Sequence, residues 1–251
     1  MKRCIEALVG VGVVATLAFA TAAHAVSPVV QLRGKAWLAD APGSTIDPAN
    51  FHVITRFSTD TPGAPLFTIQ QAVIFFPDHA GTNGRLFPSC SASQIERFRG
   101  NVKRCPKGSK IGSGTVTAQA LQLGITARGQ VAMFNGPGGR SITFNIRTLL
   151  PAYINESIDA PLAQLHGRYG EKLTLTVPRS LQEVLSGVFV GVQDFDVTLG
   201  GLTRVRGVDY RYLKARTCPR IPMHGVFDFK DWPSGQTATT TIDSKVHCTI
   251  R

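Results

Sequence analysis

Hydrophobic and polar residues alternate along much of the chain. In residues 172–177 (KLTLTV) every second position is apolar, and residues 140–147 repeat the pattern with Ile142, Phe144 and Ile146. A period of two is what a half-buried antiparallel strand requires, because successive side chains point to opposite faces. The alternation therefore predicts a protein built mainly from antiparallel strands.

Strands are predicted wherever such a pattern is bounded by turn-forming residues. Residues 68–76 (TIQQAVIFF) end in a continuous apolar run, which predicts a strand buried on both faces. Glycine and proline clusters at 61–63, 136–139, 200–201 and 233–235 separate many of the segments. The expected strands are 29–38, 51–58, 68–76, 113–120, 125–134, 140–147, 172–177, 188–199, 204–214, 223–229 and 236–247.

Two short helices are predicted between the strands. Ser93 with Glu96 has the spacing of a capping box, and Ser180 with Glu183 repeats it, with Gly187 as a left-handed residue closing the second helix. Regular strand spacing with few helices is typical of an antiparallel β-sandwich. We expect a single sandwich domain over residues 26–251, and the alternative is two small β domains divided near 136–139.

The first 25 residues have the layout of a secretory signal peptide. Lys2 and Arg3 precede an apolar stretch over 7–20, and Ala23-His24-Ala25 supplies small residues for cleavage. The apolar stretch is shorter than the roughly 20 residues that a membrane anchor needs. We therefore expect cleavage after Ala25, a secreted or extracytoplasmic envelope location, and no transmembrane span once the signal is removed.

Export places four cysteines in an oxidising compartment once Cys4 leaves with the signal. An even number of cysteines predicts two disulfides. Of the three possible connectivities we favour Cys90–Cys105 and Cys218–Cys248, because each pair closes a short local loop, with chain-entropy estimates of about 3 and about 3.5 kcal/mol. A four-cysteine metal site is the alternative, but the C-x-x-C spacing is missing. We expect no metal and no cofactor.

Two stretches around the cysteines resemble a motif of uncharacterised exported proteins of actinobacteria. Residues 87–90 (FPSC) and 105–114 (CPKGSKIGSG) are similar to the family pattern P-x-C, a short helix, then C-P-x-x-S-x-I-G-x-G. Residues 134–136 (FNG) and the late Cys218-Pro219 with Cys248 also fit, so the resemblance spans residues 65–250. It implies an exported β protein with two local disulfides. It implies no activity, and no catalytic residue is carried over from it.

Positive charge is concentrated in two segments. The chain has 27 Lys and Arg against 16 Asp and Glu, a formal net charge of +11 at pH 7. Residues 95–110 and 204–220 each hold six cations and one carboxylate. If the second segment is one unbroken strand, its cations and tyrosines share a face and suit a polyanion or anionic glycan; the alternative is a solvated strand without a ligand. The candidate ligand-binding residues are Arg97, Arg99, Lys103 and Arg104, and Arg204, Arg206, Tyr210, Tyr212, Lys214 and Arg216.

Recognisable catalytic motifs are missing from the sequence. Neither H-E-x-x-H nor G-x-S-x-G occurs, so zinc peptidase and α/β-hydrolase chemistry have no support. Asp194 and Asp196 fall on the same face of a predicted strand and are the candidate pair for the acid and base of a glycosidase.

These features favour a non-enzymatic exported β-sandwich. We expect it to bind an anionic envelope polymer, glycan or lipid surface through residues 95–110 and 204–220. Nucleic acid is not an expected partner, because the sequence has no nucleic-acid motif and export separates the protein from nucleic acid. The alternatives are a carbohydrate-active hydrolase of the envelope, acting through Asp194 and Asp196, and a structural or interaction module.

Overall fold

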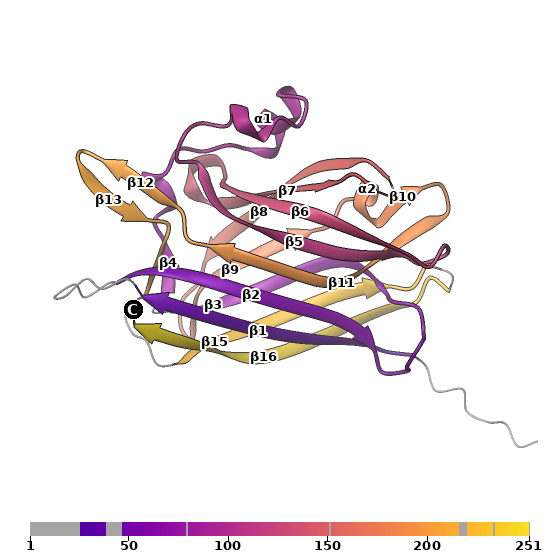
Figure 1. Cartoon of the computed structure of the whole chain (residues 1–251). Helices are drawn as coiled ribbons and strands as arrows, with labels where there is room; N and C mark the ends of the chain where they lie inside the picture. Colours follow the sequence, from indigo (N-terminus) through magenta and orange to yellow (C-terminus); the bar gives the residue numbers. More distant parts are fainter. Residues whose placement is uncertain are drawn as a thin grey trace, which may run out of the picture.

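The fold is mainly β, as the alternation predicted (Figure 1). The computed structural model describes residues 26–38, 47–78, 80–150, 152–215, 220–232 and 234–250. In this part of the chain, fourteen strands form one sheet and two strands form a separate hairpin. The strands are β1 (Pro28–Leu38), β2 (Asp47–Thr59), β3 (Thr68–Pro77), β4 (Ala80–Thr82), β5 (Lys110–Ala120), β6 (Ile125–Asn135), β7 (Ser141–Thr148), β8 (Ile154–Gln164), β9 (Tyr169–Thr176), β10 (Glu183–Leu185), β11 (Val188–Leu199), β12 (Leu202–Val205), β13 (Val208–Arg211), β14 (Leu213–Ala215), β15 (Arg220–Lys230) and β16 (Thr237–Ile250).

Short helices lie in the connections between strands. The α-helices are α1 (Ala92–Arg97) and α2 (Arg179–Gln182), and the single 3-10 turns are η1 (Gly84–Leu86), η2 (Val102–Arg104) and η3 (Pro137–Gly139). Within the described ranges, no helix has the length and apolar character needed to cross a membrane.

The large sheet closes on itself. β11 pairs with β5 along one edge and with β2 along the other. Following the pairs from β11 through β5, β6, β7, β8, β9, β3, β15, β16, β1 and β2 therefore returns to β11. Every pair in this ring is antiparallel except β1 with β16, which is parallel. The result is a near-barrel sheet, which we call the ring, with an inner face and an outer face.

The strand directions define two ends of the ring. At one end lie β4, η1, η3, β14 and the β12–β13 hairpin; at the other lie α2, β10 and the short β5–β6 and β7–β8 loops (Figure 1). We call these the β4 end and the α2 end. The β4 end is on the left of Figure 1, and the two longest connections, from β3 to β5 and from β11 to β15, lie there.

The apolar positions of the alternating strands face the inside of the ring. Val131, Met133 and Phe144 belong to one buried cluster. In β11 the alternation breaks, and a bulge between Val192 and Asp194 takes up the extra residue. Because a bulge shifts the side-chain parity by one, apolar residues line the interior on both sides of it.

Two strand predictions are wrong in detail. Residues 204–214 are not one unbroken strand, because Arg206 (φ 51°) and Gly207 (φ 83°) form the turn of the β12–β13 hairpin. β3 is not buried on both faces: Ile74 and Phe76 pack in the interior, whereas Phe75 packs on the other face against Tyr169 and His224, and all three are only partly buried.

The helix starts also differ from the prediction. α1 is capped by Ser91 and Gln94 instead of Ser93 and Glu96: the Gln94 N–H donates to Ser91 Oγ at 3.2 Å, and the Ser91 N–H donates to Gln94 Oε1 at 2.8 Å. α2 begins after Pro178 without a side-chain cap, and Gly187 (φ 75°) lies in the turn between β10 and β11.

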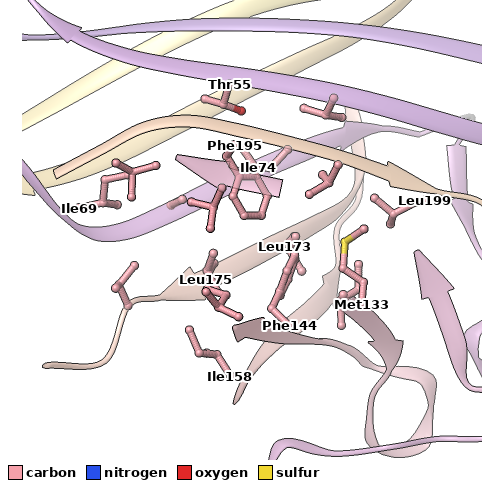
Figure 2. Close-up of a pocket in the computed structure, with 18 of the residues that line it drawn as sticks. Thr55, Ile69, Ile74, Met133, Phe144, Ile158, Leu173, Leu175, Phe195 and Leu199 are labelled. Carbon is pink, nitrogen blue, oxygen red and sulfur yellow. The ribbon is translucent and has the colours of Figure 1, made fainter. Parts of the chain in front are cut away.

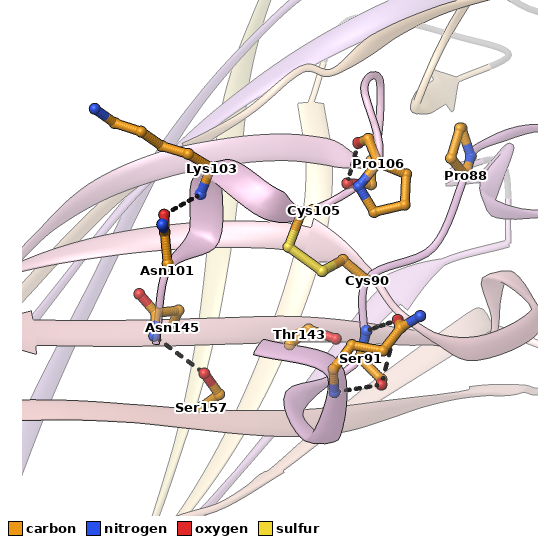
Figure 3. Close-up of a disulfide and its surroundings, with 12 residues drawn as sticks. Pro88, Cys90, Ser91, Asn101, Lys103, Cys105, Pro106, Thr143, Asn145 and Ser157 are labelled. Atoms are coloured by element: carbon orange, nitrogen blue, oxygen red, sulfur yellow. Dashed lines mark hydrogen bonds between the residues drawn. A yellow bond between two sulfur atoms is a disulfide. The ribbon is translucent and has the colours of Figure 1, made fainter. Parts of the chain in front are cut away.

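Cys90 and Cys105 form a disulfide, as predicted, with their Cα atoms 5.6 Å apart (Figure 3). The bond joins the two ends of the segment that contains α1 and η2, and the fully buried Cys90 packs with Ile95 and with Phe134 of β6. Cys218 lies outside the described residues, and its pairing with Cys248 stays a prediction. The predicted signal peptide, residues 1–25, lies outside them as well.

Candidate binding cavity and its polar mouth

The interior of the ring holds a cavity of about 270 Å³ (Figure 2). Its walls come from strands all around the ring and include Ile74, Met133, Phe144, Leu173 and Phe195. Almost all of the lining is apolar, so the walls offer water few hydrogen-bond partners. An apolar guest gains free energy by leaving water for such a space.

Small side chains leave this space open. Ala118 on β5 and Ala127 on β6 are directly opposite each other in the ladder, and both line the cavity. Ala72 and Gly129 line it as well. Because a well-packed interior is normally filled by larger residues, the volume follows from these positions.

The ring is least tightly closed between β8 and β9. In the described ladder these strands pair only over Leu162–Gln164 with Glu171–Leu173. Towards the α2 end they continue without pairing to each other, and Ile158 and Leu175 from the two strands both line the cavity (Figure 2). This stretch is therefore the weakest part of the cavity wall.

A second cavity, of about 700 Å³ and polar in character, adjoins the first at the β4 end. Thr82, Leu162, Glu171 and Lys214 line both cavities, so the two lie side by side with these side chains between them. We call the second cavity the vestibule. Its other lining residues are Asn83, Gly84, Arg85, Leu86, Gly139, Arg140 and Gln164.

Two glycines bring the arginines of the vestibule together. A Cβ on Gly84 would lie 2.6 Å from the carbonyl oxygen of Gly139, and Gly139 has a φ of 67°. Only glycine fits so close an approach of two backbones. Arg85 and Arg140 follow these glycines directly, and both side chains are exposed.

Asn135 holds this part of the vestibule in place. Its side chain is fully buried, and Nδ2 donates to the carbonyl oxygens of Gly84 and Phe87 at 3.0 Å and of Pro88 at 3.2 Å. The Cys90 N–H also donates to the Asn135 carbonyl at 2.8 Å. Asn135 belongs to the FNG stretch of the resemblance, and it joins the FPSC stretch to β6.

Buried polar groups mark the boundary between the cavities. Glu171 is only 6% exposed, and it accepts a hydrogen bond from Gln164 Nε2 at 2.5 Å. Tyr212 is fully buried, edge to face with Phe87, and its hydroxyl has no hydrogen-bond partner of good geometry within the described residues. Burial, followed by the nearby Glu171 carboxylate, raises the pKa of Tyr212 above its ordinary value.

The structure scatters the candidate residues of the second basic segment. Lys214 lines the vestibule and Tyr212 is buried behind it. Arg204 makes two hydrogen bonds to Asp209 across the hairpin, at 2.7 and 3.0 Å, and this pairing lowers the pKa of Asp209. The expected single face of Arg204, Arg206, Tyr210, Tyr212, Lys214 and Arg216 is wrong, because the chain turns at Arg206; Arg216 itself lies outside the described residues.

The first basic segment lies on α1 and η2, above β7 and β8 (Figure 1). Arg97 is in the last turn of α1, Arg99 has a φ of 56°, and the Arg104 guanidinium lies 4.9 Å from the centre of the Phe98 ring. Lys103 donates its N–H to Asn101 Oδ1 at 3.2 Å (Figure 3).

The two basic segments approach each other at one point. A Cβ on Gly108 would lie 3.2 Å from Thr203 Oγ1, so the loop after Cys105 touches the start of the β12–β13 hairpin. Thr203 directly precedes the second segment, so the end of one segment lies beside the start of the other at the β4 end, whereas the cations of α1 come earlier in the chain.

Asp194 and Asp196 lie on the outer face of β11. Asp194 Oδ1 accepts from Arg56 Nε at 3.1 Å, and Asp196 Oδ1 is 2.7 Å from His52 Nε2. Both partners are on β2, so these contacts span the pairing that closes the ring. Neither aspartate lines the cavity or the vestibule, and the arrangement fits a role in joining the two strands.

No family model, curated protein or solved structure matches the chain. In the part of the chain that the structure describes, no group of three or more His, Cys, Asp or Glu side chains is placed to hold a metal ion. Sequence reasoning missed Arg85 and Arg140, which stand as single cations in glycine-rich turns. They share a vestibule only because η1 packs on η3.

Proposed function

We propose that the protein is a non-enzymatic binding protein of the cell envelope that holds an apolar chain inside the ring. The observation that carries this proposal is the cavity of about 270 Å³ with its apolar lining. The envelope location rests on the sequence of residues 1–25.

The size of the cavity favours a slender guest. Pockets for drug-sized ligands enclose about 300–1,000 Å³, and this cavity is slightly smaller. Each methylene transferred from water contributes about 0.8 kcal/mol, so a chain with eight buried methylenes gains roughly 6 kcal/mol before ordering costs. A single acyl or alkyl chain is the ligand class that best matches the volume of the cavity and this gain in free energy.

We also propose that the ring is flattened into the two facing layers of a β-sandwich, in a single domain over residues 26–251. In Figure 1, β1, β2, β15 and β16 run together on one side of the molecule, while β5, β6 and β7 run together on the other. Facing layers about 10 Å apart in an experimental structure would support this arrangement. A circular cross-section would contradict it.

The cavity proposal is tested by filling the space. The double variant Ala118→Phe/Ala127→Phe places two rings at facing positions of β5 and β6. We expect its affinity for the neutral apolar fluorophore N-phenyl-1-naphthylamine to fall at least tenfold relative to the unmodified protein.

The matched control is Thr115→Phe, which adds a ring at an exposed position of β5. It should bind the fluorophore as the unmodified protein does. Overpacking costs about 1–3 kcal/mol, so the thermal melt of each variant must show a folded protein. Equal affinity in the filled variant and the control would refute binding inside the ring.

A second candidate function is the attachment to an anionic envelope surface expected from the sequence. The approach of Gly108 to Thr203 favours it, because it places the first basic segment beside the start of the second at one end of the molecule. Neutralising Arg97, Arg99, Lys103 and Arg104 together should weaken binding to isolated envelopes and flatten its salt dependence. Unchanged binding at low and high salt would exclude this function.

A further inference from the structure

We propose that the vestibule binds the anionic head group of an amphiphile whose apolar chain occupies the cavity. The ligand class is a single-chain lipid that ends in a carboxylate or a phosphate. This inference rests on the proposed function, because it assigns the polar half of the same ligand.

The apolar cavity and the polar vestibule adjoin each other. Thr82, Leu162, Glu171 and Lys214 line the apolar cavity and the polar vestibule alike. A molecule that fills the cavity and leaves it at the β4 end therefore enters the vestibule. A purely apolar guest would leave these polar groups without a matching partner.

The charged side chains that line the vestibule are mostly cations. Arg85, Arg140 and Lys214 line the vestibule against one carboxylate, that of Glu171. Among the described residues none of the three cations takes part in an ion pair, whereas Arg56, Arg179 and Arg204 on other surfaces each pair with an acid. Two guanidinium groups with unused donors suit a carboxylate or phosphate, since their planar forks bind such oxygens in pairs.

The backbone that carries the two arginines is held in place by neighbouring contacts. The backbones of Gly84 and Gly139 touch, Asn135 fixes the carbonyls of Gly84 and Phe87, and the disulfide holds the next segment. The arginines therefore start from backbone positions that are set before a ligand arrives. Ordering costs on binding fall accordingly.

The lining of the cavity explains why the charged group stays outside it. Almost all of that lining is apolar, whereas the vestibule is lined by Arg85, Arg140 and Lys214. A charged head in the cavity would lose its hydration without gaining hydrogen-bond partners, while a neutral chain enters at no such cost. The boundary thus sets the orientation, with the chain inside and the head in the vestibule.

The test compares ligands that share one chain and differ in the head. Dodecanoate, dodecyl phosphate, neutral dodecanol and inorganic phosphate are titrated calorimetrically into the full, oxidised protein. We expect both anionic amphiphiles to bind at least tenfold tighter than dodecanol, and inorganic phosphate alone to show no binding. The tighter of the two anionic amphiphiles identifies the carboxylate or the phosphate as the preferred head.

The variant Arg85→Gln/Arg140→Gln should lose at least tenfold in affinity for the anionic amphiphiles and keep its dodecanol affinity within twofold. Lys214→Met is a second, independent variant that should also lose at least tenfold in affinity for the anionic amphiphiles; its dodecanol affinity is not a control, because Lys214 also lines the cavity. The control is Arg128→Gln/Arg147→Gln, which removes two exposed cations from β6 and β7 away from the vestibule and should change neither affinity.

The outcomes separate the two proposals. If dodecanol binds as tightly as dodecanoate and neither vestibule variant changes this, the head-group site is wrong and the apolar cavity stands. If inorganic phosphate binds as well as dodecyl phosphate, the vestibule is an anion site unrelated to the chain, and the inference is overturned. If none of the three amphiphiles binds, the proposed function itself fails.

Discussion

The two ends of the ring differ in what closes them. At the β4 end, long connections fold back over the strands, carry a disulfide and the buried Asn135, and enclose a cationic vestibule. At the α2 end, short loops leave apolar side chains uncovered; Leu150, for example, is 78% exposed. Six of the nine large exposed apolar residues in the described chain lie there: Leu123, Ile125, Leu149, Leu150, Tyr153 and Leu185.

This difference shows how connection length determines chemistry on one scaffold. A short hairpin loop has no neighbouring layer to pack against, so its side chains stay in solvent. A connection of about thirty residues, such as that from β3 to β5, has room for helices, caps and a crosslink. The β4 end can therefore hold charged groups at fixed positions. Substitutions there should cost more stability than substitutions at the α2 end.

The largest effect is expected from removing the Asn135 amide at the β4 end. Asn135→Ala leaves three carbonyl oxygens without their shared donor, and we expect a loss of about 4 kcal/mol in the free energy of unfolding. The comparison at the α2 end is Gln122→Ala, which removes one exposed hydrogen bond to the Phe189 N–H and should cost about 1 kcal/mol or less. Urea unfolding measures the free energy of unfolding of both variants. Equal losses would show that the two ends of the ring do not differ in this respect.

Removing the disulfide comes next. Cys90→Ala/Cys105→Ala opens a crosslink between residues 15 positions apart and should lower the free energy of unfolding by about 3 kcal/mol. Chemical denaturation of the oxidised protein and the variant gives this value. An unchanged midpoint would mean that the β4 end holds its shape without the crosslink.

Lowering the pH should weaken one ion pair at each end of the ring, and both pairs should lose stability as their carboxyl groups are protonated. The Gly187 N–H and then Arg179 lower the pKa of Glu183 at the α2 end, and Arg204 lowers the pKa of Asp209 at the β4 end. A carboxyl whose pKa is lower in the folded state stabilises the protein above its unfolded value of about 4 and loses this effect as pH falls through the folded value.

Glu183→Gln and Asp209→Asn test this titration. Each variant should melt at a slightly lower temperature than the unmodified protein at pH 7, because exposed pairs contribute little. Each difference should shrink as the pH falls below about 4 and disappear at a pH below the lowered pKa of the folded carboxyl. A difference that stays constant down to that pH would show that the effect is not the titration of the carboxyl group.

The smallest effect is expected at the exposed loop of the α2 end. Leu150→Ser should change the free energy of unfolding by no more than about 0.5 kcal/mol, because the side chain is mostly in solvent already. Thermal unfolding measures it. A loss of several kcal/mol would show that this loop is packed in solution.

The sequence predicted a strand well where the alternation of apolar and polar residues is unbroken or the flanking turns are clear. The alternation at 140–147 matches β7 closely, since this strand has one face turned to the interior, and the predicted strand 188–199 matches β11 although its alternation shifts at the bulge. β8 was missed because Glu156 interrupts the apolar parity of Ile154, Ile158 and Leu162 and because Pro161 disfavours a strand. The position of α1 was missed because Ser91 with Gln94 and Ser93 with Glu96 both have the capping spacing.

The candidate site was beyond the reach of such patterns. Lys214 was predicted from its basic segment, but Arg85 and Arg140 join it through the contact of η1 with η3 and the pairing of β14 with β4. The cavity depends on small residues, such as Ala118 and Ala127, that face each other only once the register of β5 and β6 is known. Charge density along the chain pointed instead to Arg204, whose partner Asp209 lies across a turn that the pattern did not reveal.

The most direct test of the central claim is to extract the lipids that copurify with the protein from its native host and identify them by mass spectrometry. The cavity account predicts a single-chain amphiphile in stoichiometric amount on the unmodified protein and on Thr115→Phe, and its loss from Ala118→Phe/Ala127→Phe. The same lipid in the same amount on all three proteins would contradict binding inside the ring.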